Sequence, residues 1–228
     1  MERLKLYALF VANFIGTVCF WVSMLRGLRH SVKGINISWL ALGLCFLILN
    51  IWLQINSLCE SHAQLRDETR SRKIEAVWRV LAIYLTATFF NFVNLSVLVL
   101  NGRSWNLIDT ITCLLVGVGT SVLVLRHRKA LFSAAARGEL AGLFKGTPQF
   151  FLAYSLLSAG GGSMRWDTNI SQHFIGWLRL FQAIGSCRAS RDPGSVASMW
   201  SEVWSMLSLC AITLAMIVGP YLTGGARH

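Results

Sequence analysis

A face of polar and small residues runs along the apolar stretch 170–187. Its members are spaced 4, 3, 3 and 4 residues apart, which puts them on one side of a helix. They are Gln172, Gly176, Arg179, Gln182 and Ser186. A guanidinium group binds carboxylates through paired hydrogen bonds, and in an apolar helix it must face protein or water because lipid exposure costs at least ~2.5 kcal/mol. We predict that Arg179, Gln172 and Gln182 bind a small polar solute, with an anion favoured; a structural Arg–Gln network is the alternative.

A second polar face lies within the stretch 80–100, at intervals of 4, 3 and 3 residues. Its members are Tyr84, Thr88, Asn91 and Asn94. An amide group that faced lipid would lack hydrogen-bond partners, so both asparagines are expected to point into the protein. We assign Tyr84, Asn91 and Asn94 to the same ligand-binding site, with hydrogen bonding between helices as the alternative.

The segment 145–151 reads K-G-T-P-Q-F-F inside another stretch long enough to cross a membrane. Pro148 has no N–H, so the carbonyl of Phe144 loses its helical partner and the helix is expected to kink. Membrane helices that proline and glycine interrupt mark the hinges and sites of transporters. We predict a functional hinge at Gly146, Pro148 and Gln149; a passive kink is the alternative.

Residues beside this segment also allow two interpretations each. Gly138, Gly142 and Gly146 recur every fourth residue, a spacing that lets a second helix approach closely, and packing alone would explain it. Lys145 lies about one turn from the start of the stretch. Its ammonium group is expected either to reach back to the membrane surface or to face an aqueous cavity.

Two residue pairs fit helix starts. Asn106 precedes Asp109 by three residues, the spacing of an N-cap residue and the side chain that caps it in return. We therefore interpret Asp109 as a capping residue and not as an intramembrane acid. Asn169 and Gln172 have the same spacing, and Asn169 is predicted to cap the helix that follows it.

The sequence offers no candidate catalytic residue, metal site or cofactor site. Its six cysteines form no C-x-x-C pair, and four of them lie in the middle of predicted spans, where they are expected to pack as small apolar residues. No H-E-x-x-H motif, nucleophile–base pair or acidic metal cluster occurs. We expect a protein that is not an enzyme and has no cofactor.

Composition points to a membrane. Hydrophobic residues make up 54% of the 228 residues and charged residues only 14%, whereas soluble domains average about 25% charged. Five apolar runs approach the ~20 residues that cross a bilayer. They cover 6–25, 36–58, 80–100, 105–125 and 203–222. With the more polar stretches 140–159 and 170–187 as two further spans, the chain is predicted to be a multi-pass integral membrane protein whose partner is the lipid bilayer.

The formal net charge of +11 does not indicate nucleic acid. Most lysines and arginines cluster in the short segments between spans, which is typical of topology signals and of contacts with anionic lipid. Because no basic soluble segment is present, we exclude nucleic acid as a partner. The larger share of Lys and Arg flanks the spans on the N-terminal side, which favours a cytoplasmic N-terminus.

Three short patterns occur twice in the same order. The frame G-T-x-x-F begins at residues 16 and 146, N-I-S-x-x-x-x-G at 36 and 169, and V-W at 77 and 203. The offsets of the first two patterns, 130 and 133 residues, differ by the length of the glycine run at 160–162. At the positions of Arg179 and Gln182, the first copy has Phe46 and Leu49.

These duplicated patterns predict two repeats of three spans each. The repeats comprise 6–25, 36–58 and 77–100, then 140–159, 170–187 and 203–222. The span 105–125 lies between them and returns the chain to its starting side, so the repeats are parallel and Asn36 and Asn169 share one side of the membrane. The predicted fold is all-α, with seven transmembrane helices in two parallel three-helix repeats joined by a linker helix. The units are 1–102, 103–130 for the linker, and 131–228.

This layout, with Pro-Gln in the first helix of a repeat, resembles the PQ-loop superfamily, which includes the SWEET sugar transporters, lysosomal amino-acid exporters and the KDEL receptor. The residues P-Q-F-F-L-A-Y and I-S-Q-H-F-I-G-W-L-R-L-F-Q are similar to two consecutive helices of the KDEL receptor. The resemblance implies an N-terminus outside, opposite to the charge bias. The chain departs from the family at Val18-Cys19, where many members have Pro-Gln, and it has no clear match to the family's asparagine near the end of the seventh helix.

Two functions fit these features. The first is a membrane transporter in which two three-helix bundles move around a central site and pass a small polar, anionic solute by alternating access. The second is a protein that binds without translocation, either a seven-helix receptor or an accessory subunit of an oligomer or larger membrane complex.

Overall fold

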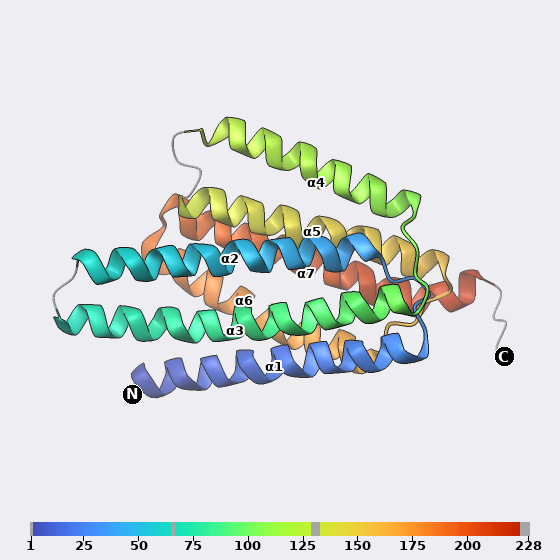
Figure 1. Cartoon of the computed structure of the whole chain (residues 1–228), viewed down its shortest axis with the longest axis horizontal. Helices are drawn as coiled ribbons and strands as arrows, with labels where there is room; N and C mark the ends of the chain where they lie inside the picture. Colours follow the sequence, from blue (N-terminus) through green and yellow to red (C-terminus); the bar gives the residue numbers. More distant parts are fainter. Residues whose placement is uncertain (1, 65–66, 129–132, 224–228) are drawn as a thin grey trace.

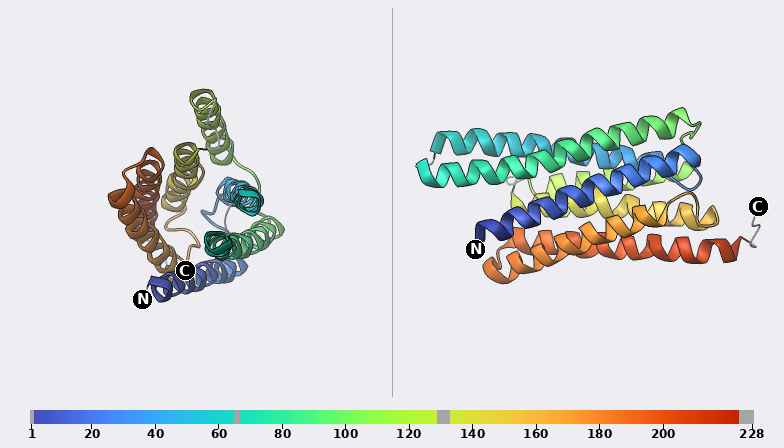
Figure 2. Two further views of the ribbon diagram at one scale, coloured as in Figure 1. Left: turned by 90° about the vertical axis from the view of Figure 1, so that its left-hand side faces the viewer. Right: turned by 90° about the horizontal axis from the view of Figure 1, so that it is seen from below.

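The computed structural model describes residues 2–64, 67–128 and 133–223. Within them the chain forms seven α-helices and no strand (Figure 1). The helices are α1 (Glu2–His30), α2 (Ile37–Gln64), α3 (Asp67–Leu100), α4 (Leu107–Arg126), α5 (Ala134–Ser158), α6 (Trp166–Ser190) and α7 (Pro193–Leu222). They lie side by side in an elongated bundle with the two chain termini at opposite ends (Figures 1 and 2).

The helix lengths agree with a helical membrane protein. Among the described residues, five segments are long and apolar enough to cross a membrane, in line with the five strong predicted spans. They are Leu6–His30, Ile37–Asn56, Ile74–Leu100, Leu107–Arg126 and Pro193–Leu222. Helices α5 and α6 have 25 residues each, and at 1.5 Å per residue a helix of that length extends about 37 Å, enough to span hydrocarbon.

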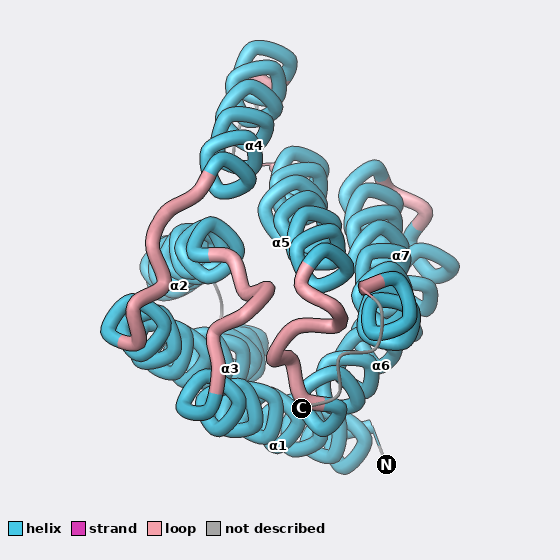
Figure 3. The backbone as a smooth tube through the Cα atoms, turned by 90° about the vertical axis from the view of Figure 1, so that its right-hand side faces the viewer, coloured by secondary structure: helices cyan, strands magenta, loops and turns pink. Residues whose placement is uncertain are grey.

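The helices pack in the same order in the two halves of the chain. Helix α3 contacts both α1 and α2, and α7 contacts both α5 and α6. Between the halves, α1 contacts α6 and α2 contacts α5, while α4 lies on the outside against α5 and α2 (Figures 1 and 3). Six helices therefore surround a common interior, and α4 stands outside that ring.

Two connections, 31–36 and 159–165, meet at one end of the bundle, which we call the closed end. The backbone N–H and the hydroxyl of Ser163 both donate to the carbonyl of Lys33, each at 2.9 Å. The glycines at 160–162 have φ values of 69°, 90° and 63°, a left-handed conformation that other residues rarely adopt, and they make the tight turn possible. Figure 3 looks onto this end.

The predicted helix cap at Asn169 is wrong. Helix α6 begins at Trp166, after the N-cap residue Arg165, and in its first turn the Asp167 carboxylate accepts the N–H of Thr168 at 2.8 Å. Asn169 therefore lies inside the helix, where its amide donates to the hydroxyl of Thr213 on α7 at 3.0 Å. Near the same closed end, Asn36, its counterpart in the predicted repeat, directly precedes α2.

The predicted cap at Asp109 is confirmed, and it has a second role. The Asn106 side chain accepts from the Asp109 N–H at 2.9 Å, and the Asp109 carboxylate accepts from the Asn106 N–H at 3.1 Å. The other oxygen of this fully buried carboxylate accepts from the N–H of Ser38, in the first turn of α2, at 2.8 Å. Asp109 thus joins α4 to the first half of the chain through hydrogen bonds that a carboxylate charge strengthens.

The glycines spaced by four in α5 form the contact surface for α7. An added Cβ on Gly138 would lie 2.8 Å from the backbone between Ala197 and Ser198, and one on Gly146 would collide with the indole of Trp204. Gly142 has more room, since its added Cβ would lie 3.6 Å from the nearest atom of α7. These contacts favour the packing interpretation of the glycine pattern.

The glycine contacts predict unequal effects of alanine. Gly146→Ala should lower the free energy of unfolding by about 1–3 kcal/mol, because α7 or the indole must shift to admit the methyl group. Gly142→Ala is the matched control and should be neutral or should stabilise by up to about 1 kcal/mol through helix propensity. Thermal unfolding of both variants in detergent checks this prediction, and equal losses would contradict the close packing at Gly146.

Candidate functional site

A cavity of about 460 Å³ lies inside the ring of six helices, between the two halves of the chain. Helix α4 contributes none of the residues that line it, whereas each of the other six helices contributes at least three. Ser186 and Ser198 line it close to the α6–α7 connection, so the cavity reaches toward the end of the bundle opposite the closed end. The volume lies in the range typical of small-molecule sites.

Five of the six predicted ligand-binding residues line this cavity. They are Tyr84 and Asn91 on α3 with Gln172, Arg179 and Gln182 on α6. Residues of both polar faces found in the sequence therefore border the same space.

Asn94 is the predicted ligand-binding residue that the structure places elsewhere. Its side chain is fully buried, and its amide donates to the carbonyl of Trp21 on α1 at 3.2 Å and to that of Phe90 at 2.9 Å. Asn94 does not line the cavity and joins α3 to α1, as the helix-to-helix alternative predicted.

Asn91 combines both roles that the sequence suggested. In the amide orientation that satisfies its neighbours, it donates to the carbonyl of Leu40 and accepts from the N–H of Leu44, both at 3.2 Å. A Cβ on Gly43 would lie 3.1 Å from this amide, so the absence of a side chain there lets α3 and α2 meet. Asn91 supports the cavity wall while facing the cavity.

Two of the three predicted hinge residues, Gly146 and Gln149, contact α7. Pro148 is buried within α5, which continues through it. Gln149 lines the cavity and accepts a hydrogen bond from the hydroxyl of Ser208 on α7. Gly146 is covered by Trp204. The helix around the proline is therefore held against α7.

Lys145 faces the cavity, so the interpretation in which it reaches the membrane surface is wrong. Its ammonium group lies 2.7 Å from a carboxylate oxygen of Glu202 on α7 and 5.8 Å from the ring centroid of Phe46. Ion pairing and the ring face both stabilise a cation that is largely removed from water.

Glu202 was missed by the sequence analysis. It directly precedes the apolar run 203–222, but α7 begins nine residues earlier, at Pro193, so Glu202 lies inside the helix. The signal was present in the chain, because a lone acid within a long helix requires a basic partner.

Arg179 is the cation of the cavity whose charge has no direct partner. It makes no hydrogen bond or ion pair with any residue in the described parts of the chain, although its charge acts on both Lys145 and Glu202. Two cations and one carboxylate leave one positive charge uncompensated inside a mostly apolar protein. Such a site favours an anion, because Arg179 can offer a carboxylate two parallel hydrogen bonds.

Two further polar residues of the cavity, Asn13 and Thr17, were also missed. Both lie on α1 and are at least nine-tenths buried. The side-chain oxygen of each, like that of Gln172 on α6, has no hydrogen-bond partner among the described residues. Their spacing of four residues in the first span was the sequence signal, since it puts both on one face of a helix.

Aromatic side chains separate the cavity from the closed end. Phe20 and Trp21 on α1 pack with ring centroids 4.6 Å apart, and Trp39 on α2 lies 6.5 Å from Phe20. All three line the cavity and are buried. They give it an apolar wall on the side of the connections that meet at Ser163.

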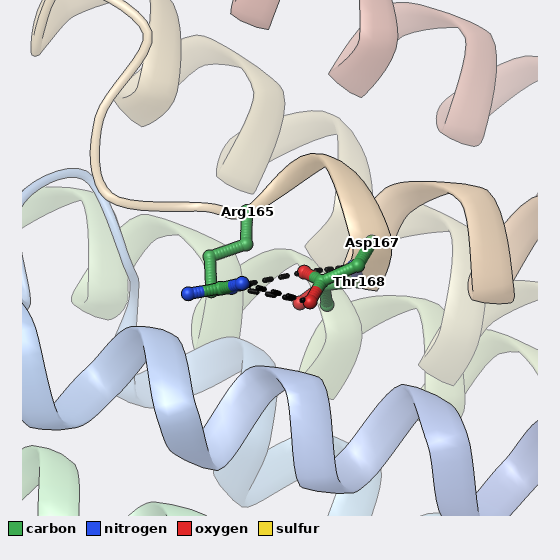
Figure 4. Close-up of polar contacts among 3 residues, drawn as sticks. All are labelled: Arg165, Asp167 and Thr168. Carbon is green, nitrogen blue, oxygen red and sulfur yellow. Dashed lines mark hydrogen bonds and ion pairs between the residues drawn. The ribbon is translucent and has the colours of Figure 1, made fainter.

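A salt bridge at the start of α6 adds to the closed end (Figure 4). The Arg165 guanidinium donates to both carboxylate oxygens of Asp167, at 3.0 Å each, and one of these oxygens also accepts from the N–H of Thr168. The hydrogen bonds from Arg165 hold the pKa of Asp167 below its ordinary value. The Arg165 side chain also lies over Gly27 of α1, 3.4 Å from the position of an added Cβ.

No family model, no curated protein and no solved structure matches the chain. Among the described residues, no group of three or more His, Cys, Asp or Glu side chains could hold a metal ion.

Proposed function

We propose that the protein is a membrane transporter that moves a small polar, anionic solute by alternating access between its two three-helix groups. The observation that carries the proposal is Arg179, an unpaired cation in a cavity between the two halves of a membrane-type helix bundle. An unpaired charge is expensive in such surroundings and is expected to serve a ligand. The electrostatics favour a carboxylate-bearing solute.

The packing order supports the finer architecture within this proposal. The third helix lies in the middle of each group, α3 in one and α7 in the other, which is what two parallel repeats joined by α4 would produce. Phe46 and Arg179, which the proposed repeats would make equivalent, line the same cavity. We therefore propose seven spans in a PQ-loop-like arrangement, with α5 and α6 polar because they line the solute site.

The structure also suggests which parts must move. The cavity reaches toward one end of the bundle, while the Lys33–Ser163 hydrogen bonds and the aromatic wall lie between it and the closed end. Passage through the protein requires these contacts to separate and the opposite end to narrow. Because α5 is held against α7 at Gly146 and Gln149, we expect α7 to follow α5 when α5 bends at Pro148.

Reconstitution into lipid vesicles tests the function. The purified protein should carry radiolabelled organic anions into vesicles preloaded with unlabelled anion, at a rate that saturates with concentration. Empty vesicles and the Arg179→Ala variant are the controls. Anion binding without accumulation would overturn the transporter proposal and favour the receptor alternative, and the absence of both would overturn the site.

Pro148→Ala tests whether the proline is a hinge. Alanine restores the hydrogen bond to the Phe144 carbonyl, so the variant should be as stable as the wild type or more stable by about 1 kcal/mol. It should nevertheless move solute several-fold more slowly, because the helix loses its ready point of bending. Unfolding temperature and vesicle flux are measured together. Flux at the wild-type rate would show that the proline is a passive kink.

Val18→Pro is the matched variant for the first repeat. Val18 lies where the repeat would have its proline, within the continuous helix α1, so a proline there should mainly destabilise the protein by about 3 kcal/mol. A Val18→Pro variant with wild-type stability would contradict the expected asymmetry between the two halves.

A further inference from the structure

Three oxygen atoms in the cavity wall lack partners in the described parts of the chain and lie where α1 meets α6. They are Asn13 Oδ1, Thr17 Oγ1 and Gln172 Oε1. Asn13 is 8% exposed and Thr17 only 3%. Buried oxygens of this kind are costly unless a donor reaches them, so each is a position at which a ligand can gain a hydrogen bond.

The contact at Gly16 shows how these residues lie relative to Arg179. A Cβ on Gly16 would lie 2.8 Å from the side chain of Ile175, so the two helices touch at that level. Helix α1 ends, and α6 begins, at the closed end, so they run in opposite directions. Gln172 therefore lies on the closed-end side of this contact, and Arg179 lies on the other side. The two residues are about 10 Å apart along the axis of α6, because a helix rises 1.5 Å per residue.

The helix directions also place the two α1 residues. Asn13, three residues before Gly16, lies on the Arg179 side of the contact, and Thr17 lies at its level. The positive charge and the unpartnered oxygens therefore follow one wall of the cavity in succession. A single elongated ligand could contact all of them.

The chemistry of this wall limits the ligand. Carbonyl-type oxygens of Asn13 and Gln172 accept hydrogen bonds, so the facing ligand groups must donate them. An ammonium group is disfavoured, because the cavity already has an uncompensated positive charge and these oxygens carry no full negative charge to offset its desolvation. Hydroxyl groups donate without a charge and meet no such penalty.

We infer that the cavity selects polyhydroxylated carboxylic acids, with the carboxylate on Arg179 and the hydroxyls on Asn13, Thr17 and Gln172. This inference rests on the proposed function and assigns its substrate class. The aromatic wall formed by Phe20, Trp21 and Trp39 completes the site with a face for the carbon skeleton.

Matched probes separate the two halves of the inference. Gluconate has a carboxylate and hydroxyls, hexanoate is the same carbon chain without hydroxyls, and sorbitol has the hydroxyls without the charge. Binding of each to the full-length protein in detergent micelles is measured by calorimetry. We expect gluconate to bind at least tenfold more tightly than either of the other two, and equal affinities for gluconate and hexanoate would overturn the inference.

Thr17→Val is the decisive variant, because valine keeps the shape of threonine and removes its oxygen. Gluconate affinity should fall about tenfold, while hexanoate affinity should stay within twofold of wild type. The control is Thr120→Val on α4, whose hydroxyl donates to the Val116 carbonyl outside the cavity, and it should leave both affinities unchanged. An equal loss for both acids in Thr17→Val would contradict a hydroxyl subsite.

The outcomes also distinguish this inference from the proposed function. If both acids bind equally and Arg179→Ala abolishes their binding, the anion site stands and only the hydroxyl subsite fails. If neither acid binds, or if Arg179→Ala binds them normally, the anion site itself fails and the inference fails with it.

Discussion

Arg179→Ala is expected to reduce anion uptake into vesicles about a hundredfold while the protein still inserts and folds. Two hydrogen bonds from a guanidinium group to a carboxylate contribute about 3 kcal/mol, and each 1.4 kcal/mol changes an affinity tenfold. No described residue pairs with Arg179, so its removal leaves no buried partner behind. Uptake and unfolding temperature are measured on the same preparation.

Two further variants test whether the loss is specific to the guanidinium group of Arg179. Arg179→Lys keeps the charge but loses the planar pair of donors, so its uptake should fall about tenfold. Arg188→Ala removes a cation from the last turn of the same helix, where the residue is exposed and does not line the cavity, and its uptake should stay at the wild-type rate. Normal uptake by Arg179→Ala would show that Arg179 does not bind the solute.

Lys145→Met is expected to lower the free energy of unfolding by about 3 kcal/mol. Removing one member of a buried ion pair leaves the other charge without compensation, which typically costs 3–5 kcal/mol. We expect the lower end of this range, because Lys145 and Glu202 keep 20% and 13% of their side-chain surface exposed. Chemical unfolding in mixed micelles provides the measurement.

The double variant Lys145→Met/Glu202→Met is the matched control for this loss. It removes both charges and replaces them with flexible apolar side chains, so most of the lost stability should return. If the double variant is as unstable as the sum of the two single variants, the two residues do not form the ion pair described above.

The sequence predicted the helices and much of the cavity for one physical reason. Side chains that must avoid lipid repeat with the helical period, so the faces containing Arg179 and Asn91 were visible in the spacing alone. The spacing could not show which residues of a face line the cavity and which bond to a neighbouring helix. Asn94 is one turn from Asn91, yet it donates a hydrogen bond to a carbonyl of α1. Whether such an asparagine lines the cavity or joins two helices depends on where the neighbouring helices lie.

Other features depended on where helices start. Glu202 was missed and Asn169 was wrongly predicted to be a cap because α7 and α6 begin before the apolar runs in the sequence. When the first turn of a helix is polar, hydropathy does not distinguish its residues from those of a loop. Lys145 was ambiguous for a related reason, since a lysine near the end of an apolar run can reach water by two routes, and its partner Glu202 lies 57 residues away in the sequence.

Asn13 and Thr17 show a different limit. Single polar residues in an apolar span are common, and nothing local indicates that their oxygens lack partners. That property follows only from the contact of α1 with α6, which brings the unpartnered oxygen of Gln172 to the same cavity.

A reversible cross-link at the closed end tests alternating access most directly. Ser163 donates its backbone N–H to the Lys33 carbonyl at 2.9 Å, so cysteines at these two positions lie within the distance that a disulfide can bridge. The double variant Lys33→Cys/Ser163→Cys is made in a background without the six native cysteines and is reconstituted into vesicles. We predict that oxidation stops solute flux while anion binding persists, and that a reducing agent restores flux. If the fully cross-linked protein carries solute as fast as the protein with both cysteines reduced, transport through an opening at this end is contradicted.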